Sequence, residues 1–154
     1  MTTTVQHHID LGAIPLSMRA LASGINLVVA SDCIEKPDAY GNCNYSTNTI
    51  TVYRLGIEKG GGLLRIFAHE LAHNYCYTQR GKKDNRFLRE FAKVAREYSY
   101  YLSRRRFGSD WILNKGVVEA FCYEFSEYII GGILPKLSQC YFEKWFPLEV
   151  NNDY

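Results

Sequence analysis

The sequence lacks any long apolar run. No stretch reaches the 18 consecutive apolar residues that indicate a membrane-spanning helix. Residues 1–10 have neither the charged start nor the apolar centre of a secretory signal peptide. We therefore expect a protein that does not cross a membrane and that stays in the cytoplasm.

Cysteine is present but without a pattern. The chain has five cysteines and no C-x-x-C spacing. An odd, scattered set in a chain without an export signal is typical of reduced thiols in the cytosol. We expect each of the five to serve as a small buried apolar side chain, and they are Cys33, Cys43, Cys76, Cys122 and Cys140.

Nothing in the 154 residues divides the chain into parts. No internal repeat or linker is visible, 47% of the residues are hydrophobic, and 12 are tyrosines. Such a chain is long and apolar enough to bury a real core, which argues against disorder. The sequence predicts one domain over residues 1–154.

The N-terminal half indicates strands before a helix. A short helix is expected first, with Pro15 in its first turn and Gly24 at its end. Strands and turns should follow in this order: a buried strand over 25–31, a turn over 37–42 continued by 44–47, and a half-buried strand over 49–53. The glycines 60–62 then precede a helix that should begin at about Leu63.

The C-terminal half indicates helices. Apolar and aromatic residues recur at helical spacing over 86–107, and a further helix is expected over 117–130 before Gly131 and Gly132. The aromatic residues of the tail should pack on the core. The fold class is therefore α+β, a small N-terminal sheet followed by a helical half.

Histidine is scarce, and half of the four histidines lie in one motif. His69, Glu70 and His73 form the pattern H-E-x-x-H inside an apolar run that favours a helix. Residues four apart lie on one helix face, so His69 and His73 are placed to bind one Zn²⁺. Glu70 is rotated to the side where a metal-bound water would lie, and it is the expected general base.

A catalytic zinc needs a third protein ligand. No histidine follows His73, and His7 and His8 lie near the N-terminus, so the ligand should be a carboxylate or a cysteine. The carboxylate candidates are Glu119, Glu124 and Glu127. Glu124 lies about 140° around a helix from Glu119, so only one of these two can face the metal. The residues alone leave this choice open.

The order of strands, H-E-x-x-H helix and later glutamate resembles the gluzincin metallopeptidases over about residues 25–130. The segment 119–125 is similar to the E-x-F-x-x-x-F pattern on the third-ligand helix of lethal-factor-type protease domains. This resemblance implies a zincin-like fold, a zinc-dependent endopeptidase that acts on a protein or peptide substrate, and Glu119 as the third ligand. It also implies a substrate peptide paired with an edge strand above the motif helix, here expected at 49–53.

Two positions depart from that pattern. Many gluzincins have an acidic residue four after the ligand, where this chain has Tyr123. Lethal-factor-type domains have a tyrosine seven before it, where this chain has Ile112. The residue that stabilises the oxyanion is then predicted to be Tyr123, Tyr98 or Tyr101.

The net charge of +2 hides an uneven distribution. Residues 80–106 carry ten Lys/Arg and three acidic residues, so the rest of the chain is acidic. The basic stretch is expected to be a solvated helix face, with a docking surface for nucleic acid or an acidic partner as the alternative. Two further functions stay open: a nucleic-acid-associated zincin, including a protease of DNA-bound proteins, and an inactive regulatory zincin.

Overall fold

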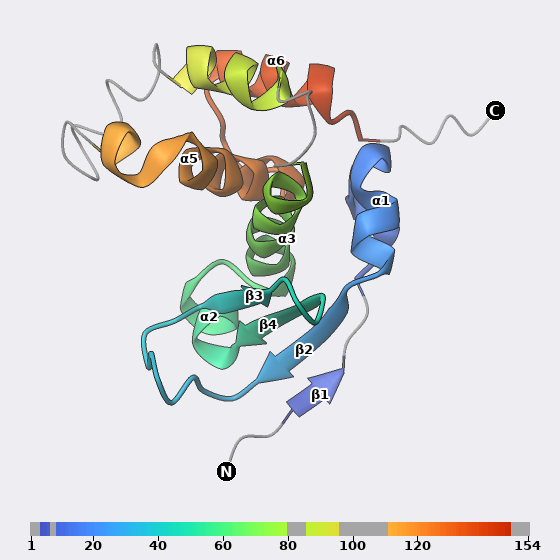
Figure 1. The fold of residues 1–154 in the computed structure, drawn as a ribbon, viewed down its shortest axis with the longest axis vertical. Helices are drawn as coiled ribbons and strands as arrows, with labels where there is room; N and C mark the ends of the chain where they lie inside the picture. The colour runs from blue at the N-terminus through green and yellow to red at the C-terminus, as the bar shows by residue number, and fades with distance from the viewer. Residues whose placement is uncertain (1–3, 7–8, 80–85, 96–110, 149–154) are drawn as a thin grey trace.

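The computed structural model describes residues 4–6, 9–79, 86–95 and 111–148. Its strands form one four-stranded sheet in the order β1-β2-β4-β3. The strands are β1 Thr4–Gln6, β2 Asn26–Ala30, β3 Gly41–Asn44 and β4 Thr49–Tyr53. β2 and β4 pair in parallel, whereas β1 and β3 are antiparallel to their neighbours. The α+β class is confirmed, with the sheet at one end of the molecule and the C-terminal helices at the other (Figure 1).

The strand at 49–53 is not an edge strand, so that prediction was wrong. β4 lies between β2 and β3, and the edge on this side of the sheet is β3, where the sequence predicted part of a turn. The reversal after β3 depends on Asn44, whose side-chain oxygen accepts hydrogen bonds from the amides of Ser46 and Thr47 at 3.1 and 3.3 Å. This turn brings Gly41–Asn44 back along β4.

The expected burial is confirmed for β4 and wrong for β2. Ile50 and Val52 are fully buried while their neighbours in β4 are half-buried, as in a strand with one covered face. β2 was predicted to be buried throughout, but only Leu27 and Ala30 are buried in it. Leu27 pairs with the buried Ile50 of β4, whereas Val28 and Val29 are half-buried and Asn26 is exposed.

The helices that lead up to and contain the H-E-x-x-H motif are α1 Leu16–Ser23, α2 Arg54–Lys59 and α3 Leu63–Gln79. A 3₁₀ turn, Leu11–Ala13, precedes α1. The helix predicted over 14–24 begins later than expected, at Leu16 with Pro15 as its N-cap, and it stops at Gly24 as expected. α2 follows β4 directly and was not predicted. Between α2 and α3, Gly61 and Gly62 have φ of 97° and 98°, a left-handed backbone that glycine adopts without strain. This turn starts α3 at the predicted residue and places it between the sheet and α5 (Figure 1).

The C-terminal helices are α5 Trp111–Ile129 and α6 Lys136–Trp145. Gly116 interrupts α5 with φ 80°, so the part from 117 onward matches the predicted helix. Residues 86–95 are also helical, which confirms the first half of the helix predicted over 86–107; the remainder lies outside the described residues. α6 was not predicted as a helix.

Aromatic side chains form the core of the helical half. Phe121 lies at its centre, with its ring centroid 5.5 Å from that of Phe91 and 5.8 Å from that of Phe142. Tyr128 donates a hydrogen bond to the carbonyl of Phe146 at 2.9 Å. The prediction that the aromatic tail packs on the core is therefore confirmed.

None of the five cysteines forms a disulfide. Only Cys122 is buried, and Cys140 is exposed on α6, so the expectation of five buried thiols was wrong. Among the described residues, no helix is both long and apolar enough to cross a membrane.

Replacing Phe142 by alanine tests how much the tail contributes to the core. Phe142 is fully buried, and truncating a buried phenylalanine costs about 3–5 kcal/mol of unfolding free energy. We expect a loss of that size for Phe142→Ala in urea titration. The control is Ile133→Ala, because Ile133 is 99% exposed and should change stability by less than about 0.5 kcal/mol. If both variants changed the free energy of unfolding by the same small amount, the packing of the tail on the core would be contradicted.

Candidate metal centre

The two histidines of the motif lie one turn apart on α3. Their ring centroids are 5.0 Å apart, and each side chain is 22% exposed. The opposite side of the helix carries Phe67 and Leu71, which are buried in the core. The apolar side therefore fixes the rotation of α3, and the histidines are turned toward α5.

Glu119 on α5 reaches both histidines. Its Oε1 lies 3.2 Å from Nε2 of His69, and its Oε2 lies 2.9 Å from Nε2 of His73. One ligand atom from each of the three residues lies within 4.8 Å of the others. Within the described ranges, this is the one group of three or more His, Cys, Asp or Glu side chains with that spacing.

The other two candidate carboxylates face elsewhere. Glu124 is buried against α6, and its carboxylate accepts hydrogen bonds from Ser138 Oγ at 3.1 and 3.2 Å. Glu127 forms an ion pair with Arg65. The geometry thus brings Glu119, and neither of the others, to the histidines.

Charge and burial make this group suited to a cation. Hydrogen bonds from His69 and His73 hold the pKa of Glu119 far below its usual range. Burial opposes the charged form of His73, yet its contact with Glu119 raises the pKa of His73 overall. Two imidazole nitrogens and a carboxylate are a ligand set that suits Zn²⁺. The residues present therefore fit the metal that the motif predicts.

Glu70, the residue after His69 on α3, borders a cavity that His69 and Glu119 also line. Burial raises the pKa of Glu70, Glu119 raises it further, and the two histidines oppose the rise. A carboxylate with a raised pKa is a stronger proton acceptor than a solvated one. Glu70 is thus a mostly buried carboxylate with a raised pKa beside the three grouped side chains.

A cavity of about 620 Å³ opens beside these residues. His69, Glu70, Glu119 and Tyr123 line it near the histidines, and it extends past Gly41 of β3 toward the loop between α2 and α3. It is large enough for a few substrate side chains. Two of the three predicted ligands, His69 and Glu119, and the predicted base Glu70 thus border a space that a substrate could enter.

Tyr123 lines the cavity one turn after Glu119, whereas Tyr98 and Tyr101 lie outside the described residues. Arg65 was missed by the sequence analysis, although it also lines the cavity. Its guanidinium carbon lies 5.6 Å from the centroid of the Tyr123 ring. The sequence spacing could have identified Arg65, because it precedes His69 by the same four residues that separate His69 from His73 and so lies on the same helix face.

The basic stretch over 80–106 is described only in part. Arg86, Arg89 and Lys93 are exposed on the helical segment 86–95, whose buried residues include Phe87 and Phe91. Three residues on a solvated helix face agree with the expectation for this segment. The other basic residues lie outside the described ranges.

Comparison with protein-family models, with curated proteins and with solved structures finds no match to this chain. Any functional assignment therefore depends on the geometry described above.

Glu124 should make the stability depend on pH. Burial raises its pKa to about 7 from 4.5, so the folded state keeps a proton that the unfolded state releases above pH 4.5. The protonated Glu124 therefore contributes to the free energy of unfolding in full below pH 4.5, and this contribution is lost as the pH rises from 4.5 to about 7. The pKa shift of Glu124 corresponds to a loss of about 3 kcal/mol in the free energy of unfolding.

The variant Glu124→Gln should remove most of that loss and retain the hydrogen bond to Ser138. The measurement is the free energy of unfolding by urea at several pH values between 5 and 8. The exposed Glu58→Gln is the control and should keep the native pH dependence. A Glu124→Gln variant with an unchanged loss would show that another group titrates.

Proposed function

We propose that the protein is a zinc-dependent metallopeptidase with a zincin-like active site. The observation that carries the proposal is the approach of Glu119 on α5 to His69 and His73 on α3. Glu70 lies beside them, at the same cavity. The three ligands and the base have the residue types and the spacing that metal-assisted hydrolysis of a peptide bond needs.

Each residue of the site has a proposed role in the hydrolysis. His69, His73 and Glu119 would hold the zinc, which when bound polarises the substrate carbonyl and makes water a better nucleophile. Glu70 accepts the proton of the attacking water and passes it to the leaving amine. Tyr123 lines the cavity and is the proposed hydrogen-bond donor to the oxygen that becomes negatively charged.

The substrate proposed for this site is an extended peptide. β3 is the edge of the sheet next to the cavity, and Gly41 of β3 lines that cavity. A peptide that adds to such an edge gains main-chain hydrogen bonds with little demand on its sequence. We therefore propose β3, rather than β4, as the strand-pairing surface. Such a surface suits an internal peptide segment, as in an endopeptidase.

The two other functions have less support. Nucleic-acid binding depends on basic residues that are mostly outside the described ranges. An inactive zincin would have no need of a carboxylate at Glu70, which is present and faces the cavity. The enzyme is therefore the function proposed.

Zinc should bind with one ion per chain. His73→Ala and Glu119→Ala should each weaken binding by more than about 100-fold, because each removes a direct ligand. Glu124→Ala is the matched control on the same helix and should keep native zinc affinity. The measurement is zinc content by mass spectrometry after dialysis against a buffered metal solution. Loss of zinc in Glu124→Ala but not in Glu119→Ala would contradict the ligand assignment.

Glu70→Gln should keep the fold and the zinc but lower hydrolysis by at least about 10²-fold, because an amide cannot accept the water's proton. Cleavage of a fluorescently labelled unfolded protein measures the rate, and zinc content and circular dichroism are the controls. Near-native turnover in Glu70→Gln would refute the general base. A zinc-loaded native protein that cleaves no peptide would instead favour a regulatory zincin.

A further inference from the structure

The face of α3 that carries the histidines continues by one turn toward the start of the helix. Arg65, His69 and His73 are spaced four apart and lie on that face. On α5, Glu119, Tyr123 and Glu127 are spaced in the same way. Their contacts pair the two faces in opposite order, with Glu119 at the histidines and Glu127 at Arg65.

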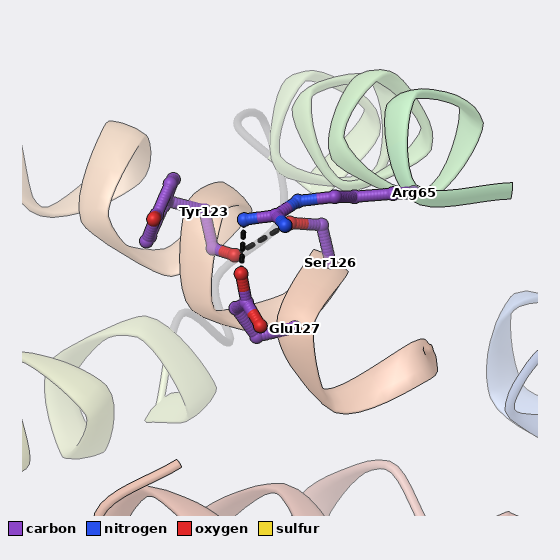
Figure 2. A network of polar contacts seen from close by, with 4 residues as sticks. All are labelled: Arg65, Tyr123, Ser126 and Glu127. Atoms are coloured by element: carbon purple, nitrogen blue, oxygen red, sulfur yellow. Dashed lines mark hydrogen bonds and ion pairs between the residues drawn. The ribbon is translucent and has the colours of Figure 1, made fainter. Parts of the chain in front are cut away.

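Arg65 and Glu127 form an ion pair between the two helices. The Arg65 and Glu127 side chains are only 23% and 18% exposed, so water screens the pair much less than a surface pair. The same guanidinium lies beside the ring of Tyr123. Figure 2 shows Arg65 reaching from α3 to the carboxylate of Glu127, with Tyr123 one turn away on α5.

The backbone around this ion pair leaves room for it. Gly61 lies against the aliphatic part of Arg65, and Gly132 lies against the carboxylate of Glu127. A Cβ atom at either glycine would collide with the paired side chain. Gly61 also has a φ of +97°, which disfavours any other residue. The two glycines therefore leave the space in which the Arg65 and Glu127 side chains meet.

We propose that Arg65 and Glu127 are positioning residues that clamp α5 to α3 and so hold Glu119 in reach of His69 and His73. The reason is that the ligands come from two helices, and their separation depends on how these helices pack. The Arg65–Glu127 ion pair lies on the same two helix faces as the ligands, one turn from His69 on α3 and two turns from Glu119 on α5. Through its contact with the Tyr123 ring, Arg65 also keeps that tyrosine against the cavity. This inference rests on the proposed metal site.

Zinc affinity tests the clamp without any need for a substrate. Glu127→Gln should raise the zinc dissociation constant by about 10- to 100-fold, the range found when residues that orient metal ligands are replaced. The matched control is Glu58→Gln, which removes an ion pair to Arg54 whose side chains are 67% and 57% exposed. The control should bind zinc with native affinity. Competition with a chromophoric chelator gives both constants.

Two further readouts separate positioning from stability alone. The visible spectrum of the Co²⁺-loaded protein reports ligand geometry, and it should change in Glu127→Gln but not in Glu58→Gln. Arg65→Gln and the double variant Arg65→Gln/Glu127→Gln should lose about as much zinc affinity as Glu127→Gln, because the pair acts as a unit. Arg65→Lys keeps the charge without the planar fork and should lose less.

Several results would overturn the clamp. A lower melting temperature in Glu127→Gln with native zinc affinity and a native Co²⁺ spectrum would make the pair a structural contact only. A higher KM in Arg65→Gln with unchanged zinc affinity would make Arg65 a substrate contact. Native protein that binds no zinc would overturn the proposed function together with the clamp, whereas native zinc affinity in Glu127→Gln would overturn the clamp alone.

Discussion

The packing of α3 against α5 is the contact on which the site depends. Both histidines belong to α3 and the carboxylate that meets them belongs to α5, so neither helix holds the group by itself. Along one line of this interface, Glu119 contacts the histidines and Glu127 contacts Arg65. A shift of one helix by a single residue would rotate these polar side chains away from each other.

Buried apolar side chains on both helices hold these polar contacts between α3 and α5 in place. α3 buries Phe67 and Leu71, and α5 buries Phe121 and Phe125. Burial of these side chains fixes how each helix is rotated about its own axis, and this rotation brings the charged groups of the two helices together where water is partly excluded. Ionic contacts in such a place gain strength from the lower local dielectric. The core therefore sets the geometry of the site, and the site adds directional contacts to the core.

The sequence predicted the site better than the sheet. The four-residue spacing of His69 and His73 defines their shared face on any helix, so local sequence was sufficient for α3. Glu119 is a long-range partner, and its selection over Glu124 came from a resemblance; the same helical rotation that turns Glu119 to the histidines turns Glu124 toward Ser138. Arg65 was overlooked because a charged residue at a helix start usually indicates a solvated position.

The errors in the fold have a common physical cause. Gly41–Asn44 consists of glycine, asparagine and cysteine, residues with little preference for a strand, and it becomes one by pairing with β4. The position of β4 inside the sheet follows from that pairing. In α6, the aromatic residues indicated burial without specifying a helix, because their contacts are with distant residues such as Phe91 and Phe121. Tertiary contacts that local sequence does not encode thus decided both elements.

The proposed zinc site is tested most directly by the crystal structure of the zinc-loaded protein, with anomalous diffraction measured at the zinc absorption edge. The proposed site predicts one anomalous peak per chain, bounded by Nε2 of His69, Nε2 of His73 and the carboxylate of Glu119, at about 2.0–2.2 Å from each ligand atom. The absence of a peak among these three residues, or a zinc bound by other residues, would contradict it.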